Sequence, residues 1–140
     1  MTKQFEILPH TADARVKVFG ETHEELFKNA LLAMAGISKS QKSNLKSQKL
    51  FQTKINIKSP DINSLLVDFL SEALYQSQMN KVIYSEVLFS KFSDTELQAE
   101  IRGNKVDSFD EDIKAVTYHE LEIKKSPPAG GFETIIVFDV

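Results

Sequence analysis

The sequence predicts an α+β fold, and three observations lead to this prediction. Apolar residues recur at helical spacing in two stretches, residues 23–37 and 61–78. Other apolar residues alternate with polar ones or form short runs, as in half-buried and buried strands. Both helices fall between early strands, and a run of strands follows them. We therefore expect residues 1–140 to form a single two-layer domain, with two main helices packed on one face of a mixed, largely antiparallel sheet.

Each predicted helix has a recognisable start. Thr22 opens a Thr-His-Glu-Glu stretch whose Glu25 matches a capping box. The second helix follows Ser59-Pro60-Asp61, where proline is tolerated in the first turn. Its apolar stripe is the clearest in the chain and consists of Ile62, Leu65, Leu66, Phe69, Leu70, Ala73 and Leu74.

The predicted strands cover the rest of the apolar sequence. Short stretches that contain glycine or proline separate them, namely Gly103-Asn104, Ser126-Pro127-Pro128 and Gly130-Gly131. The strands are expected at residues 14–19, 51–58, 82–92, 96–102, 115–124 and 132–139.

Composition excludes several classes of protein. The chain has 140 residues, 41% hydrophobic and 26% charged, as in ordinary globular domains. It has no cysteine, which excludes disulfides and thiolate metal sites. No segment approaches the about 20 apolar residues of a membrane span, and the N-terminal residues lack the apolar core of a secretory signal. We expect a cytoplasmic protein. The net charge of −3 argues against a dedicated nucleic-acid coat.

Residues 38–49 are polar and rich in lysine. Only one large apolar residue, Leu45, interrupts them, so they are expected to form a surface connection. The lysines could touch RNA phosphates, but a solvated linker is the simpler interpretation. They are Lys39, Lys42, Lys46 and Lys49, with Lys54 just beyond.

Two short stretches carry carboxylates next to strands. Asp13 ends the sequence His10-Thr11-Ala12-Asp13 directly before a strand, where a simple turn is one interpretation and a site for a hard cation is the other. Asp139 and the terminal carboxylate of Val140 close the last strand. If the first and last strands pair, three carboxylates meet, a set that favours Ca²⁺, Mg²⁺ or Mn²⁺ over soft metals.

A third stretch contains Lys114 and His119. Strand alternation puts His119 on the more apolar face with Thr117, Leu121 and Ile123, which is typical of a core histidine. Lys114 lies near the strand start and is expected in solvent. No nucleotide-binding glycine motif occurs, and the three histidines have no zinc-site spacing.

Taken together, these stretches resemble the archease family. The resemblance covers nearly the whole chain and rests on an ordered set: HTAD, GETHEELFKNALLAM, LLVDFLSEALY, KAVTYHEL and the terminal FDV. The chain departs from the family in residues 38–49, which are longer and richer in lysine than the family leads us to expect.

The resemblance implies a function. Archeases are metal-binding accessory proteins, not enzymes, that promote guanylylation and turnover of the tRNA-splicing RNA ligase, which joins 2′,3′-cyclic-phosphate ends to 5′-hydroxyls. It implies a divalent metal, Ca²⁺ first with Mg²⁺ or Mn²⁺ as alternatives, held by Asp13, Asp139 and Val140. The resemblance also implies a functional surface that contains Lys114. We assign His10 and His119 to the same surface.

Two other functions stay open from the residues. One is a small metal-dependent phosphoesterase, because three carboxylates and a lysine could serve such an enzyme. The other is a chaperone in tRNA modification that acts on a tRNA methyltransferase, a partner also associated with the family. Low positive charge and few aromatic residues in basic surroundings predict weak or no direct RNA binding.

Overall fold

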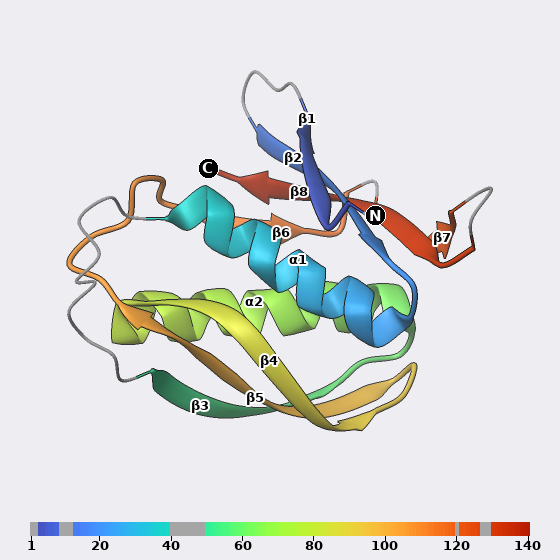
Figure 1. Ribbon diagram of the computed structural model, residues 1–140, viewed down its shortest axis with the longest axis horizontal. Coiled ribbons are helices and arrows are strands. Elements are labelled where there is room, and N and C mark those ends of the chain that lie inside the picture. Colours follow the sequence, from blue (N-terminus) through green and yellow to red (C-terminus); the bar gives the residue numbers. More distant parts are fainter. Residues whose placement is uncertain (1–2, 9–12, 40–49, 120, 127–129) are drawn as a thin grey trace.

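The computed structural model describes residues 3–8, 13–39, 50–119, 121–126 and 130–140. Strands and two long helices make up an α+β fold, so the predicted class is confirmed (Figure 1). The elements are β1 (Phe5–Leu8), β2 (Asp13–Gly20), α1 (His23–Ser38), β3 (Phe51–Lys58), α2 (Ile62–Asn80), β4 (Val82–Phe92), β5 (Glu96–Lys105), β6 (Ala115–Thr117), β7 (Lys124–Lys125) and β8 (Phe132–Asp139).

The strands form two sheets, whereas the sequence predicted one. One sheet has the order β1-β2-β8-β6, with β7 also paired to β8, and the other has the order β3-β5-β4. Every strand pair in the described residues is antiparallel. Figure 1 shows the two helices between the sheets, and each helix contacts strands of both. Both sheets therefore bury one face against the helices.

The predicted capping of α1 is present. The Thr22 side chain accepts a hydrogen bond from the Glu25 N–H at 3.1 Å, and the Glu25 carboxylate accepts one from the Glu21 N–H at 3.1 Å. The first bond satisfies an amide group that the first helical turn leaves unpaired, and the second ties the residue before the cap to the helix. The apolar face of α1 behind this cap, including Leu26 and Phe27, is fully buried.

Helix α2 begins at a similar cap. Asp61 accepts a hydrogen bond from the Ser64 N–H at 2.8 Å, and this bond lowers the pKa of the Asp61 carboxyl. The helix ends at Asn80, and the capping residue Lys81 adopts the left-handed conformation with φ of 53°. Leu65, Leu66, Phe69 and Leu70 are buried in the core, as the apolar stripe predicts. No helix in the described residues is long and apolar enough to cross a membrane.

Two strand predictions need correction. The stretch predicted as one strand over residues 115–124 is broken into the three-residue β6 and the two-residue β7. Strand β1 was not predicted, because its four residues are too few for a clear alternation. The lysine-rich residues 40–49 lie outside the described residues.

Candidate functional site

The pairing of β2 with β8 brings the two predicted carboxylates together. Asp13 and Asp139 are direct register partners at one end of the five-stranded sheet. Directly opposite residues in antiparallel strands point to the same face, with Cβ atoms about 4.5–5.5 Å apart. The next partners, Ala14 and Phe138, are buried in the core. Because side chains alternate along a strand, the two aspartates project from the outer face of the sheet.

Both aspartates are exposed. Among the residues that the structure describes, neither carboxylate has an ion-pair partner. Like charges placed directly opposite each other in a sheet are destabilising. A cation bound between the two carboxylates would remove this repulsion.

Strand β6 adds Lys114 to the same end of the sheet. Ala115 is the register partner of Asp139 on the side away from β2. The Lys114 N–H donates a hydrogen bond to the Asp139 carbonyl oxygen at 2.7 Å, and the Lys114 side chain is exposed. Val140, the next residue, is half-buried and packs against the core. The start of β2, the residues before β6 and the end of β8 thus meet at one end of the sheet.

The two predicted histidines have different outcomes. His119 follows the end of β6 in a turn and is exposed, so its predicted position on a core face is wrong. The strand ends at Thr117, whose hydroxyl accepts the His119 N–H at 3.3 Å. Strand alternation therefore does not extend to His119. His10 lies outside the described residues.

The prediction from sequence missed a hydrogen-bonded cluster around Asp68. One carboxylate oxygen accepts a bond from the Tyr118 hydroxyl at 2.5 Å, and the other accepts one from the Ser59 hydroxyl at 2.5 Å. The bond to Asp68 is the main cause that raises the pKa of Tyr118, and partial burial adds to it. The cluster attaches the residues after β6 to α2. The feature of the sequence that could have indicated this cluster is Asp68 itself, a charged residue within the apolar stretch LLVDFL.

The described residues contain no group of three or more histidine, cysteine, aspartate or glutamate side chains close enough to share a metal ion. Asp13 and Asp139 therefore supply two side-chain carboxylates within this part of the chain. Any further oxygen donors would be main-chain groups, the Val140 carboxylate, water or residues outside the described ranges.

Comparison with known proteins identifies the family. The model of the archease protein family (MTH1598/TM1083) matches residues 5–140. This range includes every element from β1 to β8. The chain belongs to the archease family.

Several archaeal archeases are similar over nearly their whole length. Protein archease of Methanosarcina barkeri is 37% identical over 148 residues, which cover 99% of this chain and 97% of the relative. The Methanosarcina mazei archease is 36% identical over 147 residues, with the same coverage. The Thermoplasma acidophilum archease is 35% identical over 142 residues, covering 99% of this chain and 95% of the relative. The resemblance drawn from the ordered motifs is confirmed.

Solved structures share the archease fold. The solution structure of Methanobacterium thermoautotrophicum protein 1598 aligns with a TM-score of 0.74 at 27% identity, covering 99% of this chain and 100% of that chain. The crystal structure of a Thermotoga maritima archease, described as a possible chaperone, aligns with a TM-score of 0.66 at 17% identity and 96% coverage of both chains. The second structure shows similarity of fold alone.

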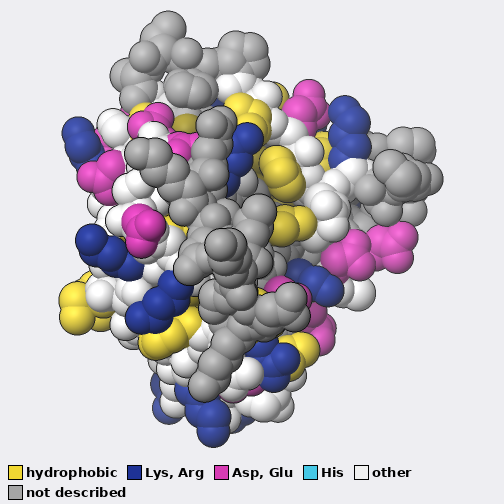
Figure 2. All heavy atoms as spheres, turned by 60° about the vertical axis from the view of Figure 1, so that its left-hand side comes forward, with side chains coloured by type: hydrophobic (Ala, Val, Ile, Leu, Met, Phe, Trp, Pro, Cys, Tyr) yellow, Lys and Arg dark blue, Asp and Glu magenta, His cyan; other side chains and the backbone are white. Residues whose placement is uncertain are grey.

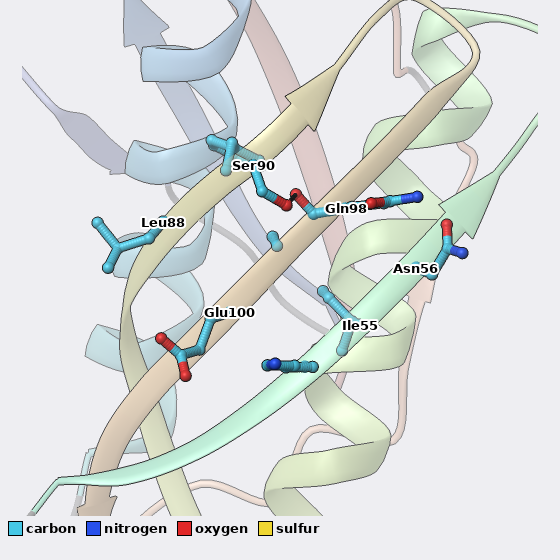
Figure 3. A pocket seen from close by; sticks show the side chains of 9 residues that line it. Ile55, Asn56, Leu88, Ser90, Gln98 and Glu100 are labelled. Atoms are coloured by element: carbon cyan, nitrogen blue, oxygen red, sulfur yellow. Dashed lines mark hydrogen bonds between the residues drawn. The ribbon is translucent and has the colours of Figure 1, made fainter.

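A broad hollow on this archease lies away from the carboxylate pair. It occupies about 620 Å³ on the outer face of the β3-β5-β4 sheet, on the other side of the helices. Figure 3 shows Asn56, Gln98 and Glu100 along this face. Glu100 is the one carboxylate among the described residues that line the hollow, and it accepts bonds from Arg102 at 2.9 Å and 3.2 Å. The hollow therefore lacks the paired carboxylates that a metal-dependent phosphoesterase would need.

Proposed function

We propose that this archease is a non-enzymatic, metal-binding accessory protein that activates a tRNA-splicing RNA ligase in the cytoplasm. It would promote guanylylation and repeated turnover of the ligase. The observation that carries the proposal is the placement of Asp13 directly opposite Asp139, with Lys114 bonded to the main chain of Asp139. Membership of the archease family supports an accessory role.

The donor chemistry fits a hard divalent cation. Asp13 and Asp139 offer carboxylate oxygens on one exposed face, and neither nitrogen nor sulfur ligands accompany them among the described residues. Oxygen-only donors suit Ca²⁺, with Mg²⁺ or Mn²⁺ as alternatives. The proposal includes the carboxylate of Val140 as a further donor. When bound, such a cation supplies positive charge that can stabilise phosphate oxygens.

Lys114 and the two histidines would form the surface that faces the ligase. The exposed Lys114 ammonium is a point charge suited to a phosphate or to an acidic side chain of the partner. His119 lies on the exposed turn after β6, a short distance along the chain from Lys114. We include His10 because it precedes Asp13 by three positions in the HTAD motif.

The exposure of the carboxylate pair favours an accessory role over catalysis by this chain alone. Metal-dependent hydrolases need a shaped and largely dry cavity around the reacting group. Asp13 and Asp139 instead project from an outer sheet face. Their chemistry would become enclosed only when a partner covers that face.

A guanylylation assay with the ligase of the same organism tests the proposal. Asp13→Asn and Asp139→Asn keep side-chain size and remove one charge each, and both should abolish most of the stimulation. The matched control is Glu86→Gln, which removes an exposed carboxylate from β4 of the other sheet. This variant should stimulate the ligase as wild type does. If both aspartate variants stimulate as well as wild type, the carboxylate pair has no part in activation.

Two further assays separate the competing functions. Turnover of phosphodiesters by the purified chain without a partner would indicate a phosphoesterase. A pull-down that recovers a tRNA methyltransferase and no RNA ligase would indicate a chaperone in tRNA modification. Recovery of the ligase is the result that we expect.

A further inference from the structure

Large apolar side chains are exposed along one side of α2 and the adjoining residues of β6. Tyr75, Met79 and Tyr118 are 54%, 65% and 59% exposed. They are three of the five large hydrophobic residues that are exposed in the described part of the chain. The other two, Ile7 and Leu88, belong to β1 and β4.

Two hydrogen bonds hold the segment from Ile113 to Tyr118 alongside α2. Tyr118 donates to Asp68 near the start of α2, and the Gln78 side-chain amide donates to the Ile113 carbonyl at 2.7 Å near its end. About 15 Å of helix axis separates Asp68 from Gln78. That length matches the extended chain from Ile113 to Tyr118 at about 3.3 Å per residue. The segment therefore runs beside α2 in the opposite direction.

A groove lies between these two elements. Its volume is about 230 Å³, and we name it the α2–β6 groove; it is lined by Ser71, Leu74, Tyr75, Gln78, Lys114, Ala115 and Val116. Tyr75 is part of its wall, and Met79 is one helical turn further along the same side of α2. The groove thus combines an apolar side with one flexible cation.

The charge of the groove is uneven. Lys114 is exposed, and no ion pair among the described residues uses its ammonium group. The Lys114 N–H is bonded to the carbonyl oxygen of Asp139, so the Lys114 end of the groove lies beside the β8 residue that carries one carboxylate of the pair. Asp68 and Glu72 lie towards the other end of α2. A ligand that lies along the groove therefore needs an acidic group at the Lys114 end.

We propose that the α2–β6 groove is the docking surface for the RNA ligase, and this inference rests on the proposed function. An apolar side chain of the ligase would pack against Tyr75 and Met79, and a neighbouring carboxylate would pair with Lys114. Tyrosine and methionine are enriched at protein–protein interfaces. Exposed apolar patches rimmed by polar groups are typical of such surfaces.

A protein suits this groove better than RNA does. Binding to a phosphate backbone requires several cations along the path of the strand. Among the described residues that line the groove, Lys114 is the single cation. Asp68 and Glu72, which line the adjacent hollow on α2, would disfavour phosphates nearby. Figure 2 shows acidic side chains interspersed with basic ones on the face that it presents, outside the grey residues.

The test compares two surfaces with the same kind of substitution. The double variant Tyr75→Gln/Met79→Gln removes the apolar side of the groove and keeps good helix formers in α2. Leu88→Gln is the control, because Leu88 is 54% exposed, as Tyr75 is, but lies in β4 on the other sheet. The measurement is guanylylation of the ligase as a function of archease concentration, with circular dichroism to verify folding.

We expect the double variant to raise the half-maximal concentration about tenfold while the maximal stimulation stays near that of wild type. Leu88→Gln should leave both quantities unchanged. A double variant with wild-type half-maximal concentration would overturn the groove as the docking surface and leave the proposed function intact. The groove would also be overturned as the docking surface if the double variant lost affinity for tRNA in filter binding while its affinity for the ligase stayed unchanged. A wild-type chain that neither binds nor stimulates the ligase would remove the proposed function, and the ligase as occupant with it.

Discussion

Asp13 and Asp139 are direct partners in the β2–β8 ladder, although nearly the whole chain separates them in sequence. Their carboxylates lie on one exposed face without a cationic partner among the described residues. The arrangement is electrostatically unfavourable without a cation. Such a pair persists because the rest of the ladder, where Val16 faces Ile136 and Val18 faces Thr134, is buried and fixes the register.

Replacing one aspartate should separate stability from metal binding. Asp139→Asn removes the repulsion, so in the presence of a chelator its melting temperature should equal or slightly exceed that of wild type. A ligand at 100 times its Kd stabilises a fold by about 2.7 kcal/mol. Addition of Ca²⁺ should therefore raise the melting temperature of wild type by several degrees and leave the variant unchanged. Differential scanning fluorimetry with and without Ca²⁺ makes the comparison.

Glu86→Gln is the control for this experiment, since it removes an exposed carboxylate from the other sheet. It should keep the full response to Ca²⁺. An Asp139→Asn protein that responds to Ca²⁺ as wild type does would show that the ion binds elsewhere.

Local chemistry made much of the fold predictable. The start of α1 follows from Thr22 and Glu25, which form the capping bonds, and the start of α2 follows from Asp61. The last strand was predicted over residues 132–139, and β8 has these bounds, because Gly130 and Gly131 precede a continuous apolar run. Caps, turns and alternation depend on residues close in sequence, so one sequence is enough to show them.

Pairing between distant segments could not be predicted in the same way. Alternation shows which side chains share a face, but it does not show which strand lies beside which, so the division into two sheets was missed. The position of His119 was wrong because β6 ends at Thr117. The bond from Tyr118 to Asp68 joins an element end to a helix fifty positions earlier, and nothing local indicates it.

The ion pair between Lys17 and Glu133 should make the β2–β8 ladder sensitive to acid. The Lys17 ammonium lies 3.0 Å from the Glu133 carboxylate, and this contact is the main cause that lowers the Glu133 pKa below its usual value of 4.5. A lowered pKa contributes stability that is present above pH 4.5 and is lost as the pH falls through the folded-state value. Urea unfolding at pH 6 and pH 3.5 should show this loss.

Glu133→Gln should be less stable than wild type at pH 6 by about 0.5 kcal/mol and should match it more closely at pH 3.5. A constant difference between the two proteins at both pH values would contradict the assignment of this acid-sensitive contribution to Glu133.

Removal of the Tyr118 hydroxyl should loosen the segment after β6. Tyr118→Phe deletes the bond to Asp68 and should lower the free energy of unfolding by about 1 kcal/mol. Tyr75→Phe, which deletes a hydroxyl that forms no hydrogen bond among the described residues, is the matched control and should change little. Urea titrations of both variants give the comparison, and equal effects would show that the Asp68 bond contributes no stability.

The same bond predicts a response to alkali. The carboxylate of Asp68 raises the pKa of Tyr118 above its usual value of 10.0, because the protonated hydroxyl is the bonded form. Its contribution to stability is fully present below pH 10.0 and is lost as the pH rises through the folded-state pKa. Ultraviolet titration should show that the phenolate transition of Tyr118, which lies above pH 10.0 in wild type, is lost in Tyr118→Phe. A variant that retains this late transition would contradict the assignment.

Extension of the chain beyond Val140 tests the proposed part of the terminal carboxylate in the metal site. Val140 packs against the core next to Asp139, so its main chain is held close to the carboxylate pair. Two added glycines would convert the carboxylate into a neutral peptide group and move the charge away. Calorimetric titration with Ca²⁺ should show affinity reduced about tenfold, since one anionic donor of a hard-cation site is lost. The same two glycines added before Met1 are the control and should leave the affinity unchanged. Equal affinities for both extended proteins would restrict the protein's carboxylate ligands to side chains.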